Sequence, residues 1–138
     1  MFKKILVALD GSPTAEQILP RLETLRNGGC EIHLLRVAVS RSIAGADAAK
    51  AQLEVLREAE EYLSHVEEKL HEQGLHVESH IRFGHPAEEI LDHCQHWHYD
   101  LIAMTTHGRS GVSRLLMGSV AENVIRKSAV PVLVIRAR

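Results

Sequence analysis

Aromatic residues are scarce in this chain of 138 residues, which holds one tryptophan, two tyrosines and two phenylalanines. Hydrophobic residues nevertheless make up 45% of the sequence, so aliphatic side chains must build the core. Such a core suits helices packed on parallel strands. It supplies few rings for stacking on bases, which argues against recognition of single-stranded nucleic acid.

A strong charge of either sign is also missing, because the formal net charge is −2 at pH 7. No global field therefore attracts the chain to DNA or to an anionic membrane, and we expect no nucleic-acid partner. Ten histidines make the surface charge responsive to mild acidification.

Cysteines and long apolar runs are few. Cys30 and Cys94 lie far apart and form no Cys-x-x-Cys motif, a pattern that favours reduced thiols in the cytoplasm. The first apolar run stops at Asp10, too early for the core of a signal peptide. No stretch approaches the roughly 18 apolar residues of a membrane span. We therefore predict a cytoplasmic protein without a membrane span.

Short apolar runs alternate with helical patterns along the chain. The predicted strands cover residues 5–9, 32–37, 77–82, 100–105 and 130–135. Helices are predicted between them, the clearest over residues 47–73 and 119–127. Strands that alternate with helices form a parallel sheet with helices on both faces and right-handed crossovers. The length and the continuous pattern predict one domain over residues 1–138.

Two of the predicted helices carry distinctive signals. The first begins with Ser12 as N-cap and Pro13 as first helical residue, and Pro20 predicts a kink or a broken turn inside it. The helix over residues 47–73 repeats apolar residues at helical spacing, which predicts an inner face. That face comprises Leu53, Leu56, Ala59, Leu63, Val66 and Leu70.

The segment over residues 105–119 carries the most informative chemistry. It leaves a buried strand, crosses a loop with glycines and enters a helix at Gly118-Ser119. A helix N-terminus offers unpaired N–H groups and a partial positive charge, which favours a phosphate site, and Arg109 and Arg114 would neutralise phosphate oxygens. Neither Gly-x-x-x-x-Gly-Lys-Ser/Thr nor Gly-x-Gly-x-x-Gly is present. An ordinary turn between strand and helix explains the same glycines.

The same segment resembles the nucleotide loop of the universal stress protein family, Gly-x2-Gly-x9-Gly-Ser/Thr. Gly108 and Gly118-Ser119 match its second and third elements, with the nine-residue gap intact. The opening Val-Ala-Leu-Asp-Gly-Ser at residues 7–12 and the ending over residues 118–134 are also similar to the family. The resemblance implies a Rossmann-like α/β fold, an open five-stranded parallel sheet in the strand order 3-2-1-4-5. It also implies binding of ATP, or of ADP or AMP, together with Mg²⁺.

Particular residues receive roles from this resemblance. Val37 would pack on the base, Met104 would lie beside it, and Asp10 would approach the phosphates and a bound Mg²⁺. A turn at the strand end is the alternative role for Asp10, and core packing is the alternative for Val37 and Met104. The implied nucleotide-binding residues are Ala8, Leu9, Asp10, Val37, Met104, Thr105, His107, Gly108, Arg109, Gly118, Ser119 and Val120.

One position departs from the family pattern. Thr105 stands where the family has its first loop glycine, and its branched side chain narrows the room beside the ribose. For His107, loop structure, phosphate donation and base catalysis all stay open. Three functions remain: a regulatory protein that binds ATP with slow or no hydrolysis, an ATPase that uses Asp10 and Mg²⁺, and a dimeric scaffold that binds no nucleotide.

Two further features concern metals and partners. His93, Cys94 and His96 resemble a metal cluster, but a solvated helix face rich in histidine is the simpler interpretation. Residues 132–135 are apolar at every position, although we expect this last strand at a sheet edge. The family resemblance implies that such a strand pairs with its copy, so we predict a homodimer through Val132 to Ile135.

Overall fold

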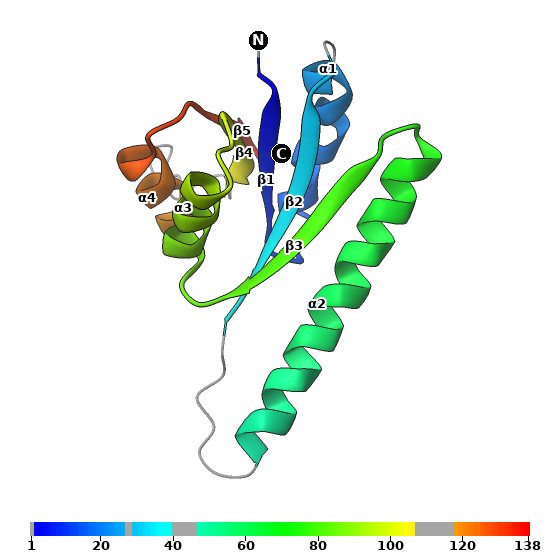
Figure 1. Ribbon diagram of the computed structural model, residues 1–138, viewed down its shortest axis with the longest axis vertical. Coiled ribbons are helices and arrows are strands. Elements are labelled where there is room, and N and C mark those ends of the chain that lie inside the picture. The colour runs from blue at the N-terminus through cyan, green and yellow to red at the C-terminus, as the bar shows by residue number, and fades with distance from the viewer. Residues whose placement is uncertain (1, 27–28, 40–46, 107–117) are drawn as a thin grey trace.

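The computed structural model describes residues 2–26, 29–39, 47–106 and 118–138 (Figure 1). The strands are β1 (Lys4–Leu9), β2 (Glu31–Ala38), β3 (Val77–Phe83), β4 (Leu101–Thr106) and β5 (Val132–Arg136). The helices are the 3-10 helix η1 (Ala15–Arg21) and the α-helices α1 (Leu22–Arg26), α2 (Asp47–Glu72), α3 (Pro86–His96) and α4 (Ser119–Lys127).

All five strands form one parallel sheet in the order β3-β2-β1-β4-β5, which confirms the predicted fold class and strand order. Figure 1 shows η1, α1 and α2 on one side of the sheet and α3 and α4 on the other. Helices therefore cover both faces, as predicted. This layered arrangement follows from apolar strand sequences that must be buried on both sides.

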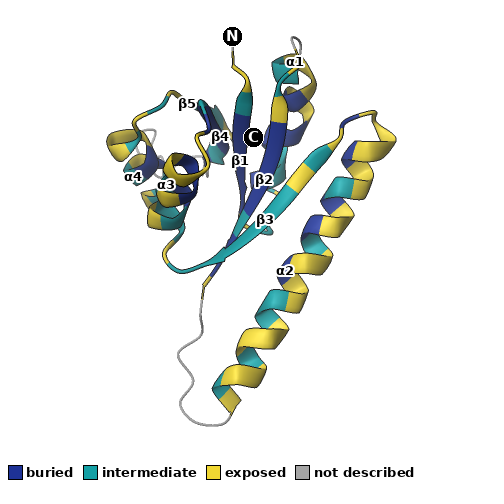
Figure 2. Ribbon diagram, in the orientation of Figure 1, coloured by how far each residue is buried: buried dark blue, intermediate teal, exposed yellow. Residues whose placement is uncertain are grey.

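Two apolar cores lie on the two faces of the sheet. Successive side chains of a strand point to opposite faces, so Ile5 and Val7 pack toward η1 and α2, whereas Leu6 packs toward α3 and α4. Every residue of β1 from Ile5 to Leu9 is buried. Figure 2 shows the central strands as the most deeply buried part of the molecule.

The first helix differs from the prediction in where it begins. Asp10 and Ser12 form a turn, and Pro13 lies outside the helix, which starts at Ala15 with 3-10 geometry. Ser12 still acts as a local acceptor, because its Oγ receives the Ala15 N–H at 3.1 Å. The broken turn predicted from Pro20 is confirmed, since α-helical geometry begins only at Leu22.

Helix α2 covers the sheet with only part of its length. Ala59, Leu63, Val66 and Leu70 are buried as predicted. Leu53 is 63% exposed, so its assignment to the inner face was wrong. The reason is visible in Figures 1 and 2, where the N-terminal half of α2 extends past the sheet. Across the described ranges, no helix combines the length and the apolar character that crossing a membrane requires.

Candidate functional site

Strands β1 and β4 separate at their carboxyl ends. The ladder between them ends at the pair Val7 and Ala103, although β1 continues to Leu9 and β4 to Thr106. The strand order reverses at this place, because the chain passes from β1 to β2 on one side and returns to β4 on the other. Open α/β sheets bind ligands beyond the carboxyl ends of strands at such a reversal.

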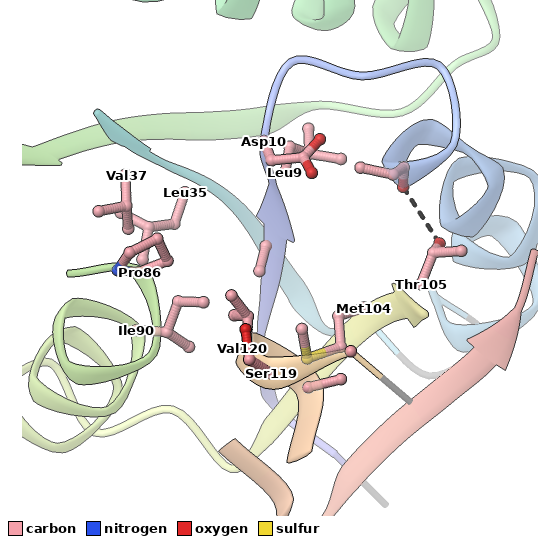
Figure 3. A pocket seen from close by; sticks show the side chains of 14 residues that line it. Leu9, Asp10, Leu35, Val37, Pro86, Ile90, Met104, Thr105, Ser119 and Val120 are labelled. Atoms are coloured by element: carbon pink, nitrogen blue, oxygen red, sulfur yellow. Dashed lines mark hydrogen bonds between the residues drawn. The ribbon is translucent and has the colours of Figure 1, made fainter. Parts of the chain in front are cut away.

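A cavity of about 260 Å³ opens at this point. Figure 3 shows the side chains that surround it, which come from β1, β2, β4, η1, α3 and α4. Its 14 lining residues are Ala8, Leu9, Asp10, Ala15, Leu35, Val37, Pro86, Ile90, Met104, Thr105, Gly118, Ser119, Val120 and Ala121.

Every predicted nucleotide-binding residue within the described ranges lies on this lining. They are Ala8, Leu9, Asp10, Val37, Met104, Thr105, Gly118, Ser119 and Val120. His107, Gly108 and Arg109 lie outside the described residues. The fold thus brings segments far apart in the sequence around one cavity, and their contact with a nucleotide stays a prediction.

Several lining residues were missed by sequence reasoning. Leu35 was detectable, because it lies two residues before Val37 and therefore on the same face of β2. Pro86 and Ile90 belong to α3, which begins just after the carboxyl end of β3 and so reaches the same edge of the sheet. Ala15 comes from η1. No sequence motif marks it.

The apolar lining occupies one part of the cavity wall. Leu35, Val37, Ile90 and Met104 supply aliphatic or thioether surface (Figure 3). Asp10 is the one charged residue among the 14 described residues of the lining. A wall of this kind accepts a flat apolar ring and leaves the polar end of a ligand to the mouth and to α4.

The start of α4 forms the opposite part of the wall. Gly118 precedes the helix with φ 83° and ψ 147°, a conformation that favours glycine. As the N-cap residue, glycine has no side chain that could form a hydrogen bond to the first turn of the helix. Ser119 and Val120 therefore present the N-terminal end of α4, with its partial positive charge, at the cavity.

Asp10 takes part in a turn at the cavity mouth. Its Oδ1 accepts the Ser12 N–H at 2.8 Å and the Ser12 hydroxyl at 2.5 Å. The turn role considered for Asp10 is therefore present in the structure. The side chain is exposed, so the same carboxylate also lines the cavity from the solvent side.

Thr105 uses its hydroxyl to hold β4 against η1. The Thr105 Oγ1 donates to the Ala15 carbonyl oxygen at 3.1 Å, the dashed line in Figure 3. A glycine here would lack this hydrogen bond. At the position of the family glycine, this chain thus has a contact between two elements of the cavity wall.

The histidine-rich end of α3 is not the solvated face that was expected. His93 and Cys94 are buried, and only His96 of the three is exposed. Burial, followed by the positive charges of His80 and Arg82, lowers the pKa of His93 to about 4. Burial also raises the pKa of the Cys94 thiol. His93 and Cys94 therefore pack α3 on the sheet.

Comparison with known proteins identifies the family. The sequence model described as "Universal stress protein family" matches residues 1–136. The chain belongs to the universal stress protein family. Universal stress protein MJ0577 of Methanocaldococcus jannaschii is 32% identical over 157 residues, covering 100% of this chain and 97% of that relative. Universal stress protein YxiE of Bacillus subtilis is 31% identical over 148 residues, covering 99% of this chain and all of YxiE.

Solved structures of universal stress proteins share the fold. The structure of MJ0577 superposes with a TM-score of 0.86 at 34% identity, covering 100% of this chain and 98% of that one. A universal stress protein family protein from Arabidopsis thaliana, solved with AMP bound, gives a TM-score of 0.71 at 21% identity, covering 99% and 92%. At that identity the Arabidopsis structure supports the fold alone.

Substitution of Thr105 tests the contact between β4 and η1 in this universal stress protein. Thr105→Val keeps the branched shape but leaves the Ala15 carbonyl without its donor, so we expect a loss of about 1 kcal/mol in the free energy of unfolding. Urea denaturation measures it. Thr14→Val is the matched control, because Thr14 makes no side-chain capping bond, and it should change stability by less than about 0.5 kcal/mol. Equal stability of Thr105→Val and the wild type would contradict the contact.

Proposed function

We propose that this universal stress protein binds an adenine nucleotide, ATP together with Mg²⁺, in the cavity between β1, β4 and α4. One observation carries the proposal: the described residues that the family pattern assigns to the nucleotide all line one cavity at the reversal of the strand order. AMP in the Arabidopsis structure supports it as a precedent within the same fold.

The base belongs against the apolar wall. Leu35 and Val37 of β2 lie on one side of the cavity and Met104 of β4 on another, with Ile90 of α3 between the helix and the sheet (Figure 3). Burial of apolar surface stabilises the complex by about 25 cal/mol for each Å² removed from water. The preformed cavity lowers the cost of ordering side chains around the ring.

The phosphates belong at the start of α4. The N–H groups of its first turn and its partial positive charge attract anions, and Gly118 has no side chain to keep a phosphate away from the backbone. In the proposed complex Ser119 adds a hydroxyl donor, while His107, Gly108 and Arg109 complete the contacts to ribose and phosphates.

Asp10 fits a role beside Mg²⁺. A carboxylate oxygen is the kind of ligand that Mg²⁺ prefers, and Mg²⁺ in nucleotide sites is usually held by one or two carboxylates, phosphate oxygens and water. Asp10 is exposed at the mouth of the cavity, where such an ion would neutralise phosphate charge. Its hydrogen bonds to Ser12 fix the orientation of the carboxylate.

We favour a regulatory protein with slow or no hydrolysis over an ATPase. Asp10 is the one acidic side chain on the described lining, and its Oδ1 is already engaged with the Ser12 N–H and hydroxyl rather than directed at a water. Turnover of ATP with Mg²⁺ distinguishes the two functions. Native mass spectrometry of the purified protein tests binding itself, and absence of any bound or bindable nucleotide would favour the scaffold function.

We also propose that the protein resides in the cytoplasm, which is a reducing compartment. Cys30 and Cys94 are both free thiols, and free thiols persist in the cytoplasm. Fractionation of cells with an antibody against the chain tests this location. Recovery of the protein outside the cytoplasm would contradict it.

The substitution Asp10→Asn separates the metal role from the turn role. The amide oxygen of asparagine can accept the same hydrogen bonds from Ser12 but carries no charge. We expect Mg²⁺ to strengthen ATP binding to the wild type, and this gain to disappear in Asp10→Asn. Calorimetry with and without Mg²⁺ measures it. The same Mg²⁺ gain in both proteins would remove Asp10 from the metal site.

The substitution Gly118→Ala tests the phosphate position. Alanine disfavours the φ of 83° at this residue and adds a methyl group where phosphate must approach the backbone. We expect ATP affinity to fall at least about tenfold, the equivalent of 1.4 kcal/mol. Adenosine is the control ligand, because it has no phosphate and should keep its affinity. Unchanged ATP binding by a folded variant would place the phosphates elsewhere.

We further propose a homodimer through β5. The strand lies at the edge of the sheet, with β4 as its one neighbour. The hydrogen bonds Ile102 N–H to Pro131 O and Ala137 N–H to Thr106 O show that odd-numbered residues of this segment face β4. Backbone groups alternate along a strand, so Val132 and Val134 direct theirs to the open edge. A second copy pairing there would satisfy both edges.

Proline at position 134 tests this dimer. Val134→Pro removes a donor from the open edge but none from the ladder to β4, so the fold should survive while the protein becomes monomeric. Sedimentation at micromolar concentration measures the mass. Val134→Thr keeps the N–H and should stay dimeric. A monomeric wild type, or a dimeric Val134→Pro, would show that β5 is not the interface.

A further inference from the structure

A second polar group lies on the sheet outside the nucleotide cavity. In the parallel register, His33 of β2 is opposite Glu78 of β3, and Leu35 is opposite His80. Alternate residues of a strand share a face, so His33, Glu78 and His80 lie on one face of two neighbouring strands. It is the face that α3 covers in part. His33 is buried there, whereas the Glu78 side chain is 73% exposed.

Three ligand atoms converge within this group. His33 Nδ1 lies 2.9 Å from His80 Nε2 and 3.4 Å from Glu78 Oε2. One ligand atom of each residue lies within 4.8 Å of the other two. Tetrahedral Zn²⁺ with bonds of about 2.0–2.1 Å separates its ligand atoms by roughly 3.3 Å. The side chains therefore already stand close to the spacing that such an ion requires.

Glu31 fixes the orientation of the His33 ring. The His33 Nε2 lies 3.3 Å from Glu31 Oε2, and an ionised carboxylate can only accept a hydrogen bond. In a metal complex, His33 would donate its Nε2–H to Glu31 and turn the lone pair of Nδ1 toward His80 and Glu78. Histidines that bind metals commonly donate their other N–H to a carboxylate in this way.

Nδ1 of His33, Nε2 of His80 and Oε2 of Glu78 meet on the inner side of the group. A divalent cation would satisfy all three groups at once, with His80 carrying its proton on Nδ1.

His93 lies beside the group but is already engaged. Its ring centroid is 4.9 Å from that of His80. The Arg82 guanidinium, which only donates, lies 3.5 Å from His93 Nδ1, and His93 Nε2 lies 3.4 Å from the Tyr99 hydroxyl. Both ring nitrogens therefore have partners.

We propose that His33, Glu78 and His80 bind one Zn²⁺ ion, with Glu31 holding the His33 ring in place. Two imidazoles and one carboxylate suit Zn²⁺, whereas Mg²⁺ and Ca²⁺ prefer oxygen ligands throughout. The exposure of Glu78 gives the ion access from solvent and leaves a fourth position for water. The site shares no residue with the nucleotide cavity, so it does not depend on the proposed nucleotide function.

Calorimetry with Zn²⁺ on untagged, EDTA-treated protein without nucleotide tests the proposal. We expect one ion per chain, and an affinity lower by about 100-fold or more in Glu78→Gln and in His80→Gln, since even orienting residues cost about 10–100-fold. Glu31→Gln should lose about tenfold. His65→Gln, at an exposed histidine of α2, is the matched control and should bind as the wild type does. Asp10→Asn should also keep its zinc affinity.

Circular dichroism confirms that each variant is folded, and Glu78→Gln changes an exposed side chain, so it is expected to fold normally. Nitrogen NMR of the rings should show zinc-dependent shifts for His33 and His80 but not for His93. Absence of stoichiometric zinc binding by the wild type would overturn the proposal. So would loss of binding in His76→Gln rather than His80→Gln, because the exposed pair His71 and His76, with Nδ1 atoms 3.1 Å apart, is the rival site.

Discussion

The ladder between β1 and β4 ends at Val7 and Ala103, and the candidate nucleotide site depends on that early end. The chain leaves β1 toward β2 on one side and returns to β4 on the other, and open α/β sheets bind ligands where the strand order reverses in this way. The cavity is therefore a consequence of topology before any side chain is considered. The side chains decide its character: Val37 and Met104 make one wall apolar, and the start of α4 makes another favourable to anions.

Polar groups around the cavity also hold its walls together. Asp10 orders the turn after β1 through Ser12, and Ser12 in turn accepts the N–H of Ala15. The carbonyl of Ala15 receives the Thr105 hydroxyl from β4. One chain of hydrogen bonds thus links β1, η1 and β4 across the mouth of the cavity. A carboxylate that is fixed in this way approaches a ligand with little loss of side-chain entropy.

The order and type of the elements were predictable because buried parallel strands give continuous apolar runs, as in β1, and because α4 has a clear start at Gly118. The set of predicted site residues followed from the family pattern and the geometry of strand ends. Leu53 was misassigned because helical periodicity does not show where the sheet beneath a helix ends. The burial of His93 was missed for a related reason: its partners lie outside the helix, Arg82 on β3 and Tyr99 beyond the end of α3.

Strand β3 bears on the cavity through α3. Arg82 of β3 forms a 2.8 Å ion pair with Glu89 of α3, and both side chains are half-buried. Arg82 also lies beside His93, so β3 and α3 are joined by charged and polar contacts rather than by apolar packing alone. Because α3 supplies Pro86 and Ile90 to the cavity wall, the position of that wall is set partly by β3 at the edge of the sheet. The edge strand β3, which is furthest from β4 in the sheet, therefore takes part in shaping a cavity that it does not line.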